Sequence, residues 1–216
     1  SSDLIFVLHD KYDEPAATAR TLEAVVEDVG QWGTEYAIDN GDGRLPKGMT
    51  GVQVITLRPG LFHTDAFLKA MVGRPCDLYL LLKSGVIPER GAIAKLVTAL
   101  SDETVGIVAP SMMQMDDTII TETGISEQRF VRDWCWGWRH ELIKAIGWME
   151  WAGQVNRECP GTDIDYCYRA RQAGYQVVQV NEAMAALPDK IDERWQSKAY
   201  KWLVWKHGLV KINEVW

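Results

Sequence analysis

The sequence predicts an α/β fold in which a mainly parallel, twisted sheet carries helices on both faces. Three observations lead to this prediction: short apolar runs alternate with amphipathic helical patterns, the apolar runs are continuous, and 216 residues are enough to bury one hydrophobic core. Parallel strands joined by helices form right-handed crossovers, which cover both faces of a sheet. We therefore expect a single domain over residues 1–191 and a helical tail over residues 192–216.

Strands and helices alternate regularly in the first half of the chain. An unbroken apolar run at residues 5–8 predicts the first strand, and the following helix begins near Asp13 and Pro15, because aspartate caps helix starts and proline fits a first turn. Pro110 is expected to close the last strand of this half. The remaining patterns predict strands at residues 36–38, 52–57, 78–82 and 105–109, and helices at residues 63–72 and 93–100.

The second half has a less regular pattern. A polar stretch with β-like residues at 118–121 is followed by a tryptophan-dense stretch at residues 134–138. The helical tail is rich in aromatic residues and either packs back on the body or forms a partner surface, such as a homodimer contact. The remaining patterns predict a short helix at residues 141–146, a helix at residues 163–173 that Gly174 ends, and a strand at residues 176–180.

Composition and charge argue against several classes of protein. The formal net charge is −7, with 23 basic and 30 acidic residues, so broad binding to nucleic-acid phosphates is disfavoured and a nucleic-acid acceptor has no positive support. No apolar run approaches the roughly 20 residues of a membrane-spanning helix, and the first residues show no signal-like pattern. The four cysteines lack CxxC spacing, which predicts a reduced, cytoplasmic protein with buried thiols.

Ligands of parallel α/β sheets bind beyond the carboxyl ends of the strands, so we expect the loops at residues 9–13, 39–44 and 83–90 to converge on one site. Asp39 either hydrogen-bonds a ribose or a base, or only shapes a turn with the asparagine and glycines that follow it. Lys83 either meets an anionic ligand or is solvated.

The second-half candidates also have two interpretations each. Asp163 begins a helix together with Asp165, and its carboxylate either deprotonates an attacking hydroxyl or caps the helix and interacts with the helix dipole. The tryptophan-dense stretch either stacks on sugar rings or fills the core.

Several segments, taken in order, carry a resemblance to a known family. They are Phe6-Val7-Leu8 with Tyr12-Asp13-Glu14-Pro15, Ile38-Asp39-Asn40-Gly41, the run at residues 77–82 with Val86-Ile87-Pro88, the run at residues 105–110, the segment at residues 138–148, and Thr162-Asp163-Ile164-Asp165 with Arg169. This series, over about residues 3–182, resembles the inverting, family-two-like glycosyltransferases of GT-A fold. The last segment is the most specific match, because it is similar to the Glu-Asp-x-Asp-Leu-x-x-Arg helix that supplies the catalytic base, with Thr162 in place of the glutamate.

The resemblance implies a Rossmann-like half over residues 1–110 that binds a UDP- or GDP-sugar type of donor, and an acceptor half over residues 111–191. It implies transfer of the sugar, with inversion, to a hydroxyl of a glycan or another acceptor. Asp163 is then the expected general base. The expected donor contacts are His9, Tyr12, Asp13, Asp39, Lys83 and Ser84, and the expected acceptor contacts are Trp136, Trp138, Trp148, Trp151 and Asp165.

One departure from the family concerns the metal. In the family, an Asp-x-Asp motif holds Mn²⁺ or Mg²⁺ against the donor diphosphate. The corresponding positions in this sequence are Lys83-Ser84-Gly85, so both aspartates are missing. A histidine often found after the last core strand is also missing from residues 181–190. We therefore expect no metal ligands and hypothesise that the Lys83 ammonium replaces the ion, helped by Arg44, Lys47 or Arg58.

Two other functions stay open at this point. A catalytically degenerate GT-A domain could bind a nucleotide or glycan, or serve as a protein-interaction module, and the missing Asp-x-Asp favours this alternative. A nucleotidyltransferase is less well supported, because no glycine-rich phosphate loop with basic residues follows the first strand.

Overall fold

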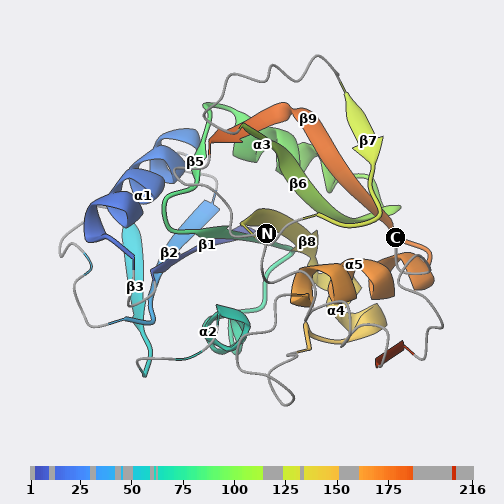
Figure 1. Cartoon of the computed structure of the whole chain (residues 1–216), viewed down its shortest axis with the longest axis horizontal. Coiled ribbons are helices and arrows are strands. Elements are labelled where there is room, and N and C mark those ends of the chain that lie inside the picture. Colours follow the sequence, from blue (N-terminus) through green and yellow to red (C-terminus); the bar gives the residue numbers. More distant parts are fainter. Residues whose placement is uncertain are drawn as a thin grey trace.

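The computed structural model describes residues 3–9, 13–29, 33–41, 45, 51–58, 61, 63–113, 124–131, 134–150, 161–186 and 206–207. These residues form one sheet of nine strands with helices on both faces, which confirms the predicted α/β class (Figure 1). The helices are α1 Pro15–Val29, α2 His63–Met71, α3 Ala92–Ala99, α4 His140–Ile146 and α5 Thr162–Gln172. The strands are β1 Asp3–His9, β2 Gly33–Asp39, β3 Val52–Thr56, β4 Leu78–Lys83, β5 Ile87–Pro88, β6 Val105–Met113, β7 Ile125–Glu127, β8 Cys135–Arg139 and β9 Gln176–Ala186.

The strands follow the order β3-β2-β1-β4-β8-β6-β9-β5 along the sheet, and β7 pairs with β9. Strands β3, β2, β1 and β4 are parallel to one another, and β6 is parallel to β9. Strand β8 lies antiparallel between β4 and β6. Strands β5 and β7 are antiparallel to β9. Most strands thus run in one direction, as expected, and the antiparallel β8 joins the two halves of the sheet.

A hydrophobic cluster covers each face of the sheet. One cluster contains Leu4, Phe6 and Leu8 of β1 together with residues of α2, α4 and α5, whereas the other contains Ile5 and Val7 together with residues of α1 and α3. This division follows from the period of two along a strand, and a strand that is covered on both faces needs a continuous apolar run. Figure 1 shows the same arrangement, with α1 and α3 on one side of the sheet and α2, α4 and α5 on the other.

Strand β8 is an element that the sequence pattern did not predict. Its residues alternate between faces, so Trp136 and Trp138 enter the cluster of α2, α4 and α5, while Cys135 enters the other cluster. Gly137 lies between the two tryptophans, and a Cβ atom added there would come 2.3 Å from Leu80 Cδ2 and 2.9 Å from the Tyr79 carbonyl oxygen. Glycine usually weakens a strand pattern, but here it permits the close approach of β8 to β4.

The ends of two strands also differ from expectation. Pro110 does not close β6, because the strand continues to Met113 through a register shift in its pairing with β9 after Pro110. Strand β9 likewise runs beyond residue 180, to Ala186. Gly174 ends α5 as predicted, with a φ of 88° that suits glycine. The predictions for residues 118–121 and for the tail, apart from Lys206 and His207, lie outside the described residues.

Candidate functional site

The carboxyl ends of β1, β2 and β4 lie side by side. His9 is the register partner of Asp39, and Leu8 is the partner of Lys83. Two hydrogen bonds continue the pairing into the loops, because the Asn40 N–H donates to the His9 carbonyl (3.0 Å) and the Ser84 N–H donates to the Leu8 carbonyl (3.0 Å). The described beginnings of the three loops therefore converge at one edge, as the parallel topology predicted.

A buried chain of polar side chains links β1, α1 and the residue after β4. The Thr18 hydroxyl lies 2.7 Å from His9 Nδ1 and 2.8 Å from the Ser84 hydroxyl, and the Gly85 N–H donates to the Thr21 hydroxyl (2.9 Å). His9 is fully buried, and its Nε2 has no hydrogen-bond partner among the described residues. A buried polar atom without a partner is costly, so this nitrogen is suited to a ligand that satisfies it.

Sequence reasoning named His9 and Ser84 but missed Thr18 and Thr21. Both threonines are fully buried on the apolar face of α1. Their spacing of three residues places them on the same face of the helix as Leu22 and Val25. Two hydroxyls on an otherwise apolar, core-facing side of the helix are the sequence feature that could have identified these threonines.

The turn after β2 is fixed by side-chain hydrogen bonds. Asp39 is buried, and its Oδ1 accepts from the Gly41 N–H (3.1 Å), so Asp39 shapes the turn, as one of its two interpretations expects. The fully buried Asn40 donates to the Leu61 carbonyl (2.6 Å) and accepts from the Leu61 N–H (3.2 Å). These bonds attach the turn to the segment before α2.

Lys83 ends β4 with a half-buried side chain. Tyr79 and Leu81 belong to the cluster of α2, α4 and α5, and Lys83 follows them in the alternation along the strand. The ammonium therefore leaves the strand on the face that also carries α5. Asp13 lies at the start of α1 with an intermediate exposure.

The first turn of α5 buries two carboxylates. Asp163 is 4% exposed, and its Oδ1 accepts from the Ile164 N–H (2.9 Å). The N-cap position belongs to Gly161, with no side-chain cap, so Asp163 is not the cap of this helix. A carboxylate in a first turn is stabilised by the helix dipole. The turn also contacts α2, because the Thr64 hydroxyl donates to the Thr162 hydroxyl (3.3 Å).

Asp165 is fully buried and is surrounded by basic side chains rather than open to an acceptor. Its Oδ2 lies 3.0 Å from Arg169 Nε, and its Oδ1 lies 2.7 Å from Lys206 Nζ and 2.8 Å from His207 Nε2. Three partners occupy the carboxylate, so the expectation that Asp165 contacts the acceptor is corrected. It anchors α5 instead.

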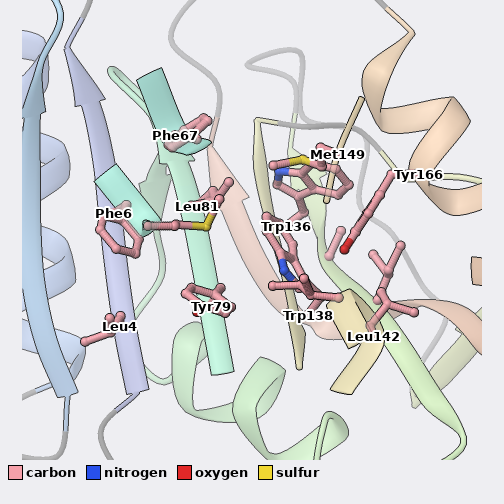
Figure 2. Close-up of a cluster of buried hydrophobic side chains, with 14 of the residues drawn as sticks. Leu4, Phe6, Phe67, Tyr79, Leu81, Trp136, Trp138, Leu142, Met149 and Tyr166 are labelled. Carbon is pink, nitrogen blue, oxygen red and sulfur yellow. The ribbon is translucent and has the colours of Figure 1, made fainter. Parts of the chain in front are cut away.

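Trp136 and Trp138 are core residues. Their side chains are 1% and 0% exposed, their ring centroids are 4.9 Å apart, and Tyr166 lies edge-on to both. Figure 2 shows the two indoles enclosed with Leu142, Met149 and Tyr166. Buried rings have no free face for a sugar, so the core interpretation replaces the expected acceptor wall at these two positions.

Trp148 keeps an accessible surface. It is 36% exposed, and its ring packs edge-on at 6.3 Å from Tyr79. Trp151 and Tyr12, the other predicted aromatic contacts, lie outside the described residues.

Known structures resemble this chain in fold. GalNAc-T7, crystallised with UDP, GalNAc and Mn²⁺, matches 90% of this chain with a TM-score of 0.70 and 12% identity. The mannosyltransferase PcManGT from Pyrobaculum calidifontis, in complex with GDP-Man and Mn²⁺, matches 91% with a TM-score of 0.61 and 12% identity. A mycobacterial protein matches 97% of this chain and 76% of its own, with a TM-score of 0.67 and 14% identity. This chain has the GT-A fold.

The GT-A enzymes resemble this chain in structure but hardly in sequence. No protein-family model matches the sequence, and no curated protein matches it. The chain spans 44% of the length of GalNAc-T7 and 59% of the length of the mannosyltransferase. Identities of this size establish the fold and leave the chemistry to be argued from the residues.

The residues at the carboxyl end of β4 do not fit the GT-A metal site. Lys83-Ser84-Gly85 offers one hydroxyl and no carboxylate, whereas Mn²⁺ and Mg²⁺ prefer carboxylate oxygens. Within the described part of the chain, no group of three or more histidine, cysteine, aspartate or glutamate side chains could hold a metal ion.

The described cysteines are buried thiols, as expected. Burial raises the pKa of Cys135 and of Cys76 to about 12 and also raises the pKa of Cys167. Such thiols stay protonated at neutral pH and are poor nucleophiles. None of the described helices has the length and apolar character needed to cross a membrane.

Proposed function

We propose that this chain is a glycosyltransferase that moves a sugar from a nucleotide-sugar donor to an acceptor hydroxyl with inversion. The observation that carries the proposal is Asp163, a nearly fully buried carboxylate in the first turn of α5 that is not the helix cap. Because capping does not account for it, the base interpretation of the same residue gains weight.

The donor occupies the edge where β1, β2 and β4 end. His9 Nε2 and Asp39 hydrogen-bond the nucleoside, and Asp13 and Ser84 are further donor contacts. Thr18 orients His9 through its Nδ1 and so fixes which nitrogen faces the ligand. The donor is a UDP- or GDP-sugar, and the half of the chain before residue 111 holds it.

The reaction is an in-line displacement at the anomeric carbon. The acceptor oxygen forms the new bond to this carbon while Asp163 takes the acceptor proton. The bond from the anomeric carbon to the diphosphate oxygen breaks on the opposite face, and its electron pair leaves with the nucleoside diphosphate. The Lys83 ammonium stabilises the negative charge that develops on the diphosphate. Trp148 supplies an aromatic surface for a glycan acceptor.

Donor binding is tested first. Thermal unfolding and calorimetry are measured with UDP-, GDP-, dTDP- and CMP-sugars, each with Mn²⁺ and with EDTA. One donor is expected to stabilise the protein in EDTA, because a ligand of the native state raises the free energy of unfolding. Binding only with Mn²⁺ would contradict the role of Lys83, and the absence of binding by every donor would contradict the transferase.

Catalysis is tested with Asp163→Asn. The variant is expected to bind the donor as the wild type does and to lose about 10²- to 10⁴-fold in kcat, because the amide cannot accept the acceptor proton. The matched control is Asp77→Asn, which changes an exposed residue just before β4, at the amino end of the strand and therefore away from the carboxyl ends of the strands. Kinetics with both variants decide the point: full activity of Asp163→Asn would overturn the base assignment.

The second candidate is a catalytically degenerate GT-A domain that binds a nucleotide or glycan. The residues at Lys83-Ser84-Gly85 favour it, because they lack both metal-binding carboxylates of the fold family. Donor binding without any sugar transfer in the assay above would support this candidate over the enzyme.

A further inference from the structure

Two residues near the end of the chain, Lys206 and His207, contact the helix that carries Asp163, and they are called the C-terminal segment below. Lys206 and His207 lie more than thirty residues beyond α5 in sequence, yet both contact Asp165 Oδ1 on the first turn of that helix. The His207 ring also lies 4.5 Å from the ring of Tyr168, one turn further along α5. Two side chains of one short segment thus hold two successive turns of the helix.

The contact is charged and buried. The Asp165 side chain is fully buried, and the side chains of Lys206 and His207 are 17% and 13% exposed. Ionised Asp165 is an acceptor only, so His207 Nε2–H donates to it. Removing one partner of a buried ion pair leaves a charge without compensation, which costs far more than losing a surface pair.

The same network extends to the exit of α4. Arg169 binds Asp165 and donates to the carbonyls of Ile146 (2.6 Å) and Trp148 (3.1 Å). Lys206 also pairs with Glu150 at 3.0 Å. Asp165 therefore connects the C-terminal segment, α5 and the stretch that carries the exposed Trp148.

Asp163 and Asp165 are two positions apart, so their side chains leave different sides of the helix. The Asp165 N–H donates to the Gly161 carbonyl (2.8 Å), which closes the turn that contains Asp163. Contacts that hold Asp165 consequently also fix the position of the Asp163 backbone through this turn. An error of about 1 Å in placing a catalytic group costs about 10²-fold in rate.

We propose that Lys206 and His207 are positioning residues of the transferase site, which hold Asp165 and thereby fix the first turn of α5 and Asp163 against the acceptor. This inference rests on the proposed role of Asp163. It assigns a function to Lys206 and His207, which are neither the proposed base nor among the proposed donor contacts.

The test uses the full chain with Lys206→Met, His207→Ala and His207→Gln. Because Asp163 acts in the chemical step, the first two variants are expected to lower kcat about 10- to 100-fold and to leave donor affinity within about twofold. His207→Gln keeps a side-chain N–H donor and is expected to recover kcat to within about threefold of wild type. Lys95→Met is the matched control, because it removes an exposed lysine that donates to the Glu182 carbonyl from α3, on the other face of the sheet.

Hydrogen exchange provides a readout that does not depend on activity. Backbone amides in the first two turns of α5 are expected to exchange at least about tenfold faster in Lys206→Met and His207→Ala than in the wild type and Lys95→Met. Unchanged exchange in α5, or unchanged kcat, would overturn the inference. A fall in donor affinity equal to the fall in kcat would also overturn it, because that result indicates general loosening.

Failure of the proposed function gives a different result. Full activity in Asp163→Asn would remove the base assignment even if α5 exchanges faster in the C-terminal variants. Loss of activity in Asp163→Asn with no effect of the C-terminal variants would remove only the positioning role.

Discussion

At the scale of single residues, Glu35 shows how burial without a partner affects stability. Glu35 lies in β2, is 5% exposed, and its Oε1 has no hydrogen-bond partner among the described residues. Burial raises the pKa of Glu35 above its ordinary value. Because its pKa is higher in the folded than in the unfolded state, protonated Glu35 contributes to the free energy of unfolding at low pH. This contribution is lost as the pH rises through the folded-state pKa and the buried carboxylate becomes charged.

Glu35→Gln is therefore expected to raise the melting temperature by about 1 to 3 °C at pH 7 and to have little effect near pH 4. The amide keeps the shape of the side chain and carries no charge to desolvate. Thermal unfolding at both pH values checks this, with Glu23→Gln, an exposed residue of α1, as the control. Equal melting temperatures for wild type and Glu35→Gln at pH 7 would contradict the expected cost of the buried charge.

At the scale of elements, α3 receives its N-terminal cap from another helix. Its N-cap residue is Gly91, which provides no side-chain bond. The carboxylate of Asp28, near the end of α1, accepts from the N–H groups of Gly91 and Ile93 instead. One aspartate thereby satisfies two amides at the start of α3, adds a negative charge to the positive end of its dipole, and ties α1 to α3.

Asp28→Ala is expected to lower the free energy of unfolding by about 1 to 2 kcal/mol, which is the usual cost of losing a helix cap. Urea unfolding measures the change, and Glu27→Ala, the exposed neighbour, serves as the control. If the two variants were equally stable, the bonds from Asp28 to α3 would contribute nothing to stability.

At the scale of the whole molecule, the order of most elements could be predicted, with β5, β7 and β8 as the exceptions, whereas the contacts between distant segments could not. Local periodicity indicated β1, α1 and β4, because each is a continuous apolar run or an amphipathic helix. The bonds from Thr18 to Ser84 and from Asp165 to His207 join residues 66 and 42 positions apart, and no local pattern specifies such pairs. The turn at Asp39 and the burial of the thiols were foreseeable, since they depend on residue type.

The tryptophan-dense stretch kept two interpretations in the sequence for the same reason. Indoles suit both a sugar platform and a core, and only the position of β8 between β4 and β6 decides that Trp136 and Trp138 are buried. The burial has a consequence for the whole fold, because β8 is the strand that joins β3, β2, β1 and β4 to β6 and β9. The packing between β8 and β4 thus determines how the two halves of the sheet are held together.

Gly137→Ala tests this junction. The added methyl group would lie 2.9 Å from the Tyr79 carbonyl oxygen, a backbone atom of β4 that cannot move without shifting the strand, and 2.3 Å from Leu80 Cδ2. Overpacking of this kind is expected to cost about 1 to 3 kcal/mol, which corresponds to a fall of roughly 2 to 12 °C in melting temperature for a chain of this length. Val54→Ala, at a 53% exposed position of β3, is the control and should change the melting temperature by about 1 °C or less. Since β4 also positions Lys83 and Ser84, Gly137→Ala should weaken donor binding as well. If the melting temperature and donor binding were both unchanged, the two halves of the sheet would tolerate a wider spacing between β8 and β4.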